Sequence, residues 1–318
     1  MKQPISKLTY RVRNWSEYNK NLCRRGSLDV WIEPKTLDAW YAVESKHGVG
    51  RPRRYSDTAI MTALLLAAVF HLPLRAAQGF LVSLVSKLDH QPVEIPNYST
   101  LCRRRKSLTS FLEDTPISAN ALQLVVDSTG LKIFGEGEWK VRQHGYSKRR
   151  TWRKLHLAVD ASTHVITAAD VTENDVHDSA MLEPLLKQIP APIASVAGDG
   201  AYDQRVCYAV LAKRDTVGII PPRKNARIWQ HGNSRAMRLS RDQALRRIRK
   251  VGRKQWKRES GYHQRSLAET AMFRMKTIFG DHLLSRIFEN QRVEALLRCK
   301  ALNIMTSLGM PESYAKAQ

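Results

Sequence analysis

The apolar positions along the chain follow two different spacings, which separate a helical first part from a mixed second part. Residues 57–72 and 73–88 combine strong helix formers with nearly continuous apolar surfaces, so they predict two consecutive helices. From about residue 115 onward, short apolar runs alternate with helical patterns, as in mixed α/β domains. This change of pattern predicts a domain boundary close to residue 114.

The second part contains five short runs with the composition or alternation of β-strands, at 122–127, 154–161, 164–171, 193–199 and 217–220. The second and third runs follow each other across a short turn, so they predict an antiparallel meander with the first. Helical patterns at 178–188 and 204–214 separate the remaining strands. The order strand, strand, strand, helix, strand, helix, strand, helix predicts an α/β fold, with a mixed sheet and flanking helices.

The segment 262–276 predicts another helix, whose two sides differ in chemistry. With ~100° between successive residues, one narrow arc carries Tyr262, Arg265, Glu269 and Lys276. The opposite side is apolar and can pack on a core. An ordinary solvated amphipathic helix is the alternative explanation; two acids upstream favour a functional role instead.

These upstream acids are Asp127 and Asp199, and each ends one of the predicted strands. An acid at the carboxyl end of a strand projects beyond the sheet, where open α/β architectures bind their ligands. With Glu269 they can provide three carboxylates, the hard oxygen donors that suit Mg²⁺ or Mn²⁺ and not zinc. Asp203 is the strongest competitor, although we expect it to cap the helix that follows it.

The charge balance indicates a polyanionic partner. The 318 residues include 52 Lys and Arg against 29 Asp and Glu, which gives a formal net charge of +23. The 43% of hydrophobic residues argue against a disordered basic chain. Nucleic acid is therefore the leading candidate partner, and an anionic membrane surface is the second.

Cysteine usage and the apolar runs bear on location. The four cysteines form no CxxC pair, which argues against a zinc site or a disulfide framework and favours a reducing cytoplasm. The amino terminus has no apolar core of a secretory signal. The longest apolar run, 59–74, is shorter than the ~20 residues that a membrane helix needs. We expect a cytoplasmic protein with no membrane partner.

The helical first part predicts a DNA-binding unit. A third helix is expected after Ser99, and its cations are Arg103, Arg104, Arg105 and Lys106. Together the three helices predict a helix-turn-helix-like domain over 57–114. Four adjacent cations surround a helix, so some of them would clamp phosphates and not read bases; the alternative is a solvated charge run. Residues 1–56 are expected to be a basic arm, mobile up to about residue 14, and a linker.

Three motifs, taken together, resemble those of a known family. The spacing of Tyr262, Arg265, Glu269 and Lys276 resembles the signature around the last acid of DDE-type transposases from bacterial insertion sequences. The segments 125–139 (VVDSTGLKIFGEGEW) and 197–203 (AGDGAYD) look like that group's surroundings for its first and second Asp. The resemblance implies a ribonuclease-H-like catalytic domain, which we place at 115–310, followed by a frayed tail at 311–318.

The resemblance also implies the chemistry of the site. Asp127, Asp199 and Glu269 are expected to be catalytic and to hold two Mg²⁺ or Mn²⁺ ions, with Asp127 bridging them. Arg265 and Lys276 would hold a DNA phosphate, and Tyr262 would order the DNA backbone. Within a basic insertion at 222–260, residues 241–258 carry nine Lys and Arg against one acid, Asp242, so passing DNA would lie against them.

The implied activity is DNA transposition. The protein would bind the inverted repeats at the ends of its element, cut there and join the ends to target DNA. It would act as a homodimer or higher oligomer, associated with the nucleoid of a bacterial cell. The alternatives are a nuclease or resolvase of the same fold that does not join DNA, and a non-catalytic DNA-binding regulator whose acids are only structural.

Overall fold

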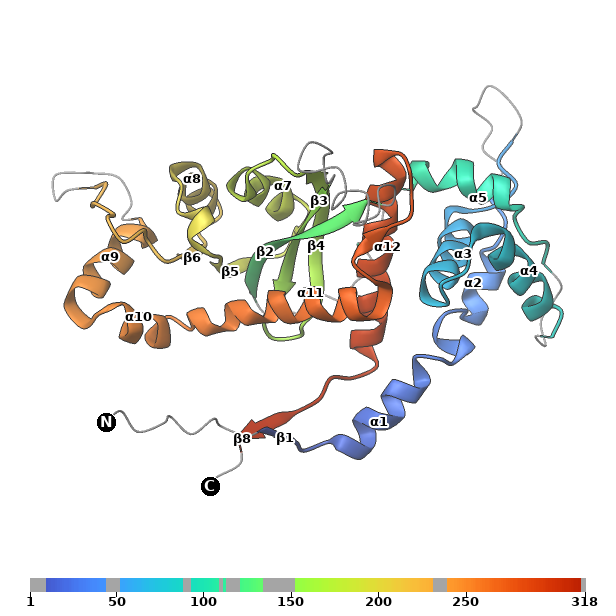
Figure 1. Cartoon of the computed structure of the whole chain (residues 1–318), viewed down its shortest axis with the longest axis horizontal. Coiled ribbons are helices and arrows are strands. Elements are labelled where there is room, and N and C mark those ends of the chain that lie inside the picture. The colour runs from blue at the N-terminus through green and yellow to red at the C-terminus, as the bar shows by residue number, and fades with distance from the viewer. Residues whose placement is uncertain are drawn as a thin grey trace, which may run out of the picture.

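The computed structural model of the chain describes residues 10–43, 52–87, 93–108, 111–112, 121–133, 152–230 and 239–315 (Figure 1). Its second part is built on a six-stranded sheet of β2 Leu122–Ile133, β3 Trp152–Asp160, β4 Ile166–Glu173, β5 Ile193–Ala197, β6 Val217–Ile219 and β7 His282–Leu283. The strands are hydrogen-bonded in the order β4-β3-β2-β5-β6, and β7 pairs with the end of β2. β2, β3 and β4 are antiparallel, whereas β5 and β6 run parallel to β2. This mixed sheet confirms the predicted mixed α/β fold.

Helices cover both faces of this sheet (Figure 1). The helical segments of this part are η3 Asp178–Met181, α7 Leu182–Lys187, η4 Gly200–Tyr202, α8 Arg205–Lys213, α9 Ser240–Val251, α10 Arg253–Glu259, η5 Tyr262–Arg265, α11 Ser266–Phe279 and α12 Phe288–Ser307. Of these, α9 and α10 lie beyond β6 (Figure 1). Successive side chains of a strand point to opposite faces. Leu124 and Val126 accordingly lie in a core with α7 and α8, whereas Val125 lies in a second core with α11 and α12.

The first part of the chain is helical, as predicted. It consists of α1 Trp15–Arg24, η1 Leu28–Val30, α2 Pro34–Asp38, α3 Asp57–Val69, α4 Leu74–Val85, α5 Tyr98–Arg104 and η2 Arg105–Ser107. The core beneath α11 and α12 continues into α3 and α5, because α3 packs against α12. The boundary near residue 114 and the helix-turn-helix assignment stay predictions. Among the described helices, none alone is long and apolar enough to cross a membrane; α3 and α4 pass that test only as a pair bent by 108°.

Strand β2 does not end at Asp127, contrary to the prediction. It continues to Ile133, because residues 128–132 pair with β3. The ring of Trp152 lies 3.0 Å from where a Cβ of residue 130 would stand, so glycine at this position admits the tryptophan. Sheet pairing and this contact override the turn preference of the sequence STG. Asp127 therefore sits in the middle of a long strand, close to the point where the neighbouring strand β5 ends.

Two short strands near the ends of the chain pair with each other, whereas the sequence predicts a mobile arm and a frayed tail. β1 Tyr10–Val12 forms a two-stranded antiparallel sheet with β8 Ser313–Ala315. The Asn14 side chain adds two hydrogen bonds, donating to the Met310 carbonyl at 3.0 Å and accepting from the Glu312 amide at 2.8 Å. Residues 1–9 and 316–318 lie outside the described part of the chain.

The segments around the third predicted acid differ in detail from the prediction. The region 262–276 begins as the 3-10 turn η5 and becomes α-helical only at Ser266. The basic run 241–258 forms two helices, α9 and α10, which meet at Gly252 with φ +82°. Only glycine adopts this backbone conformation readily, so the position turns the chain between the two helices.

Candidate active site

Sheet register brings the two predicted aspartates to the same level. Val125 of β2 pairs with Ala197 of the parallel strand β5, and Asp127 and Asp199 each lie two residues further along. Because side chains alternate along a strand, Asp127 points to the same face as Val125, which is the face covered by α11. β5 ends at Ala197, and β7 pairs with β2 only at Lys132 and Ile133, so Asp127 lies where neither strand pairs with β2.

The turn after β5 is sterically constrained. A Cβ at position 198 would lie 2.9 Å from Cδ2 of Tyr202 and 3.2 Å from Cγ2 of Val126. Glycine at 198 therefore lets the chain leave the sheet tightly. Asp199 then caps η4, with Oδ1 accepting a hydrogen bond from the Ala201 amide at 2.8 Å. This bond fixes the direction of the Asp199 carboxylate.

The third carboxylate reaches the same place from α11. Glu269 lies in the first turn of this helix, which crosses β2 and β3. Its side chain is 53% exposed. Arg265 connects it to the strand: Nη1 donates to Oδ2 of Asp127 at 2.9 Å, and Nη2 forms an ion pair with Glu269. One guanidinium group thus spans two of the three predicted acids.

The pKa of Asp127 responds to the charges of both other acids. Burial raises the pKa of Asp127, and the negative charges of Asp199 and Glu269 raise it further. The amide of Ser128 and the guanidinium of Arg265 act in the opposite direction. Like charges at such a site hold their protons more tightly unless a cation offsets them. The arrangement therefore favours binding of positive charge between the acids.

Tyr262 belongs to this group and Lys276 does not. Burial raises the pKa of Tyr262, and the charges of Asp199, Asp127 and Glu269 contribute in the same direction. Lys276 lies further along α11, where burial lowers its pKa and the nearby charges are those of Asp281 and Lys132. Its role as a phosphate ligand at the carboxylates stays a prediction that this placement does not favour.

The chemistry of the three acids fits a hard divalent cation, with one condition. Within the described ranges, no three His, Cys, Asp or Glu side chains are close enough to one another to hold a metal ion. At this site the guanidinium of Arg265 contacts both Asp127 and Glu269 and supplies the positive charge. Carboxylate oxygens are the donors that Mg²⁺ and Mn²⁺ prefer. Metal binding here requires Arg265 to turn away from at least one acid.

The cations predicted to contact DNA from the third helix are not equivalent. Arg104 donates from Nη1 to the Tyr55 carbonyl at 3.0 Å and forms an ion pair with Asp57, so it fastens α5 to the start of α3. Arg103 and Lys106 are exposed, and Arg105 is half-buried. DNA contact by the four stays a prediction, and for Arg104 it competes with this internal role.

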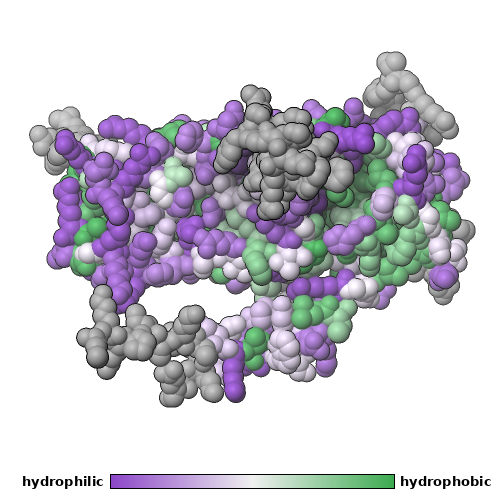
Figure 2. Space-filling view, viewed as in Figure 1, coloured by the Kyte–Doolittle hydropathy of each residue, from purple (hydrophilic) through white to green (hydrophobic). Residues whose placement is uncertain are grey.

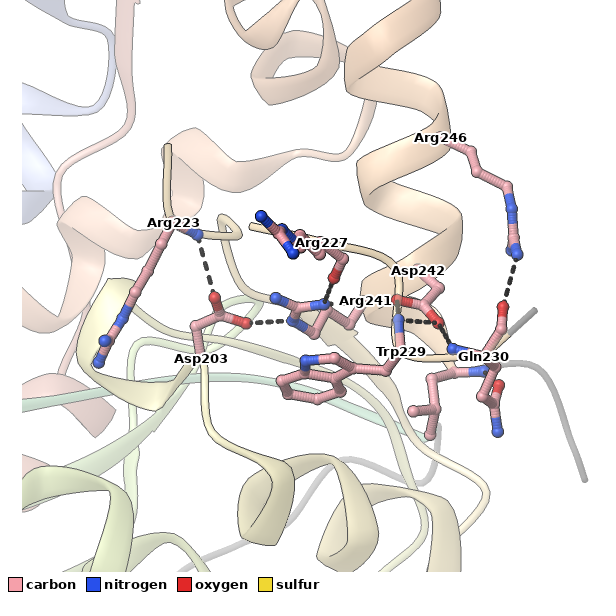
Figure 3. Close-up of polar contacts among 9 residues, drawn as sticks. Asp203, Arg223, Arg227, Trp229, Gln230, Arg241, Asp242 and Arg246 are labelled. Atoms are coloured by element: carbon pink, nitrogen blue, oxygen red, sulfur yellow. Dashed lines mark hydrogen bonds and ion pairs between the residues drawn. The ribbon is translucent and has the colours of Figure 1, made fainter. Parts of the chain in front are cut away.

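Sequence reasoning missed a buried network beside Asp199 (Figure 3). Asp203 does not cap the next helix. It accepts from Nε of Arg241 at 2.7 Å and from the Arg223 amide at 3.0 Å. Asp242 binds the amides of Trp229 and Gln230. The available signal was that Asp242 is the one acid in the basic run 241–258.

Comparisons with known proteins identify a family. A family model described as "Transposase DDE domain" matches residues 119–304, and a second model with that description matches residues 23–136. Among solved structures, the chain is similar to piggyBac transposase in a synaptic complex with hairpin DNA, determined by cryo-EM. That match has 12% sequence identity and a TM-score of 0.43, and covers 90% of this chain and 74% of that chain. The first family model spans more than half of the chain and includes Asp127, Asp199 and Glu269, so the chain belongs to the DDE transposase family.

Proposed function

We propose that the protein binds the inverted repeats at the ends of an insertion sequence and catalyses metal-dependent cleavage and strand transfer. The observation that carries this proposal is the convergence of Asp127, Asp199 and Glu269 from two adjacent strands and a crossing helix. The negative charges of Asp199 and Glu269 both raise the pKa of Asp127.

Each residue has a distinct part in the proposed mechanism. Asp127, central in the group, would contact both of two Mg²⁺ or Mn²⁺ ions, with Asp199 and Glu269 each completing one site. When bound, two such ions activate an attacking oxygen and stabilise the leaving oxygen of the phosphodiester. Arg265, once released from Asp127, would bind a backbone phosphate. Tyr262, half-buried at the same edge, would order the neighbouring nucleotide.

DNA binding is supported by the distribution of charge. Residues of α9 and α10 include the exposed cations Arg246, Arg249, Lys250, Lys254 and Arg258. The end of the molecule formed by these helices is mostly hydrophilic in Figure 2. A formal net charge of +23 adds a general attraction to polyanions. We propose that inverted-repeat and target DNA lie along this end, with two copies of the protein joining two element ends on the bacterial nucleoid.

A joining assay tests the proposed function. The donor is a DNA fragment that carries the sequences flanking the coding region, cut in advance at the predicted ends, and the target is supercoiled plasmid with Mg²⁺ or Mn²⁺. We expect joined products from the wild-type protein and none from Asp127→Asn. The matched control is Asp175→Asn, which removes an exposed carboxylate after β4 and should leave joining intact.

Other outcomes of this assay favour the two alternatives. Cleaved donor without joined product would identify a nuclease or resolvase of the same fold. Donor binding without cleavage by either protein would identify a DNA-binding regulator. In both cases the proposed strand transfer is wrong, whereas loss of DNA binding in Asp127→Asn would indicate misfolding of the variant and is checked by its Tm.

A further inference from the structure

A buried ion pair fastens the start of α9 to the turn that follows Asp199. Arg241 is 3% exposed and Asp203 is 5% exposed. Besides Asp203, Nη1 of Arg241 donates to the Arg227 carbonyl at 2.8 Å and approaches Oδ1 of Asp242 at 3.4 Å. The guanidinium carbon lies 3.6 Å from the centre of the Trp229 ring. Nε, Nη1 and one face of this guanidinium group are therefore occupied by partners within the fold.

Burying an ion pair of this kind has a large desolvation cost, which favours a role beyond stability. Removing two charges from water costs more than their attraction returns unless hydrogen bonds satisfy the remaining donors and acceptors. Here the additional bonds go to the backbone of residues 221–230, at the Arg223 amide, the Arg227 carbonyl and the Trp229 amide. The network therefore holds one loop, 221–230, in a defined conformation.

This loop lies beside the turn that contains Asp199. β6 pairs in parallel with β5, with Ile219 opposite Ala197. The loop after β6 therefore leaves the sheet at the same end of the strands as Asp199. The Pro221 carbonyl is 4.0 Å from the Cβ position of residue 200. Asp203 joins the two loops directly, because it follows η4 and binds the Arg223 amide.

The outer side of the same loop carries three exposed cations, Arg223, Lys224 and Arg227. In the described part of the chain, none of these three side chains has a hydrogen-bond or ion-pair partner, and Figure 3 draws the guanidinium groups of Arg223 and Arg227 outside the Asp203–Arg241 contact. Their backbone is fixed while their charged ends remain free. A polyanion that binds there would not have to order the loop first.

We propose that residues 222–227 form a phosphate-binding site for the DNA strand next to Asp199, and that Arg241 is the positioning residue that holds it. The inference rests on the proposed function for the identity of the polyanion. It assigns roles within the basic insertion: Arg241 is withdrawn from DNA contact, whereas Arg223 and Arg227 contact the backbone. Because phosphate contacts carry no sequence information, the site serves any DNA sequence.

A binding experiment tests the site without requiring catalysis. The probe is a fluorescent duplex of random sequence, about 30 base pairs long, titrated with the full-length protein at several salt concentrations. The test variant is Arg223→Ala with Arg227→Ala. The control variant is Lys187→Ala with Lys213→Ala, which also removes two exposed cations. Lys187 is the last residue of α7 and Lys213 the last of α8, just before β5 and β6 begin. Both therefore lie at the opposite end of these strands from Asp199.

The test variant should bind the duplex about tenfold more weakly than the wild type, and the slope of log K against log salt should fall by about 0.9 for each lost phosphate contact. The control should change the Kd by less than about twofold. Equal losses in both variants, or an unchanged slope in the test variant, would overturn the proposal. An unchanged slope would leave the loop free for an acidic protein partner. Because cleavage is not measured, the result stands even where strand transfer is absent.

Arg241 is tested by Arg241→Lys, which keeps the charge and removes the planar fork. We expect a salt slope as low as that of the test variant, and no further decrease when Arg223→Ala and Arg227→Ala are added. Amide hydrogen exchange of residues 221–230 should accelerate in Arg241→Lys. A lower Tm with unchanged exchange and slope would assign Arg241 to stability alone and overturn its positioning role. The double variant Arg223→Ala with Arg227→Ala changes only exposed residues. It therefore still tests the phosphate-binding site if Arg241→Lys does not fold.

Discussion

Two aspartates four residues apart have opposite environments, and the difference supports the proposal that Asp199 is a functional acid and Asp203 a structural one. Asp203 is buried, and each of its carboxylate oxygens accepts a hydrogen bond from a fixed donor. Asp199 has one oxygen fixed by a backbone amide and stands at the open end of the sheet, near Asp127 and Glu269. The buried bonds of Asp203 suit a role in holding the fold, whereas the half-buried Asp199 has a second oxygen that could accept a ligand.

The same contrast applies to the two arginines. Arg241 is enclosed by an aromatic ring, two carboxylates and a carbonyl. Arg265 contacts Asp127 and the half-exposed Glu269, and its side chain remains 24% exposed. Arg241 cannot move away without leaving the buried carboxylate of Asp203 without its charge partner, whereas the partly exposed Arg265 is the arginine that we propose exchanges a carboxylate for a phosphate. The burial of each ion pair therefore indicates which of the two can rearrange during a reaction.

The largest expected effect comes from Asp199→Asn. We expect its rate of DNA cleavage to fall by about 10³-fold, equivalent to about 4 kcal/mol of transition-state stabilisation. Its Tm should change little, because Asn keeps the oxygen that caps η4. Cleavage is measured in single-turnover reactions on pre-bound donor DNA. A rate within tenfold of the wild type would remove Asp199 from the catalytic group.

Asp203→Asn should show the reverse pattern. It leaves the guanidinium of Arg241 with only Asp242 to offset its charge, so the free energy of unfolding should fall by about 3 kcal/mol. The exposed control Asp175→Asn should change it by less than about 0.5 kcal/mol. Urea denaturation measures both. A small loss for Asp203→Asn, with cleavage abolished in the folded fraction, would mean that the two aspartates have been assigned the wrong way round.

The substitutions Gly198→Ala and Gly79→Ala test whether the turn before Asp199 is sterically constrained. At Gly198 the new Cβ would meet the Tyr202 ring at 2.9 Å, so the free energy of unfolding should fall by about 1–3 kcal/mol and Asp199 should shift. At Gly79, in α4, nothing lies within 4 Å, so alanine should stabilise by about 1 kcal/mol. Thermal or urea unfolding gives both signs. Equal effects at the two positions would show that the turn before Asp199 is not sterically constrained.

The smallest effect concerns protonation of Asp127. Its pKa is raised by burial, with Arg265 holding it down, so Arg265→Gln should raise that pKa further. Because the pKa of Asp127 is higher in the folded state, the free energy of unfolding decreases as pH rises from the unfolded-state pKa to the folded-state pKa. Mn²⁺ binding needs the ionised carboxylate, so it strengthens over the same pH range. Nuclear magnetic resonance titration of ¹³C-labelled aspartate measures the shift. Lys187→Gln is the control, and a similar shift there would mean that Arg265 has no specific effect.

The sheet and its flanking helices could be predicted because their signals are local. The alternation of Leu155, Leu157 and Val159 places all three in one core, as observed. The strand ends were harder to predict, because the pairing partner of a strand decides where it stops. Ser128 and Gly130 read as a turn, yet they continue β2 along β3.

The site was predictable only in part, for a related reason. Motif spacing identified Asp127, Asp199 and Glu269 as candidates, but spacing cannot show which cations occupy the space between them. The ion pair of Arg265 with Asp127 joins residues that are 138 positions apart, and that of Arg241 with Asp203 joins residues 38 positions apart. Long-range contacts of this kind leave no periodic signal. For the same reason a run of cations gave no indication that Arg241 is buried among them.

The most direct measurement of the central claim is anomalous X-ray diffraction from crystals of the protein soaked with Mn²⁺, with and without bound DNA. The account predicts an anomalous peak contacted by carboxylate oxygens of Asp127 and Asp199, a second one contacted by Asp127 and Glu269, and Arg265 turned from Asp127 toward a phosphate. Density for Mn²⁺ elsewhere, with Arg265 still bound to Asp127 in crystals competent for cleavage, would contradict it.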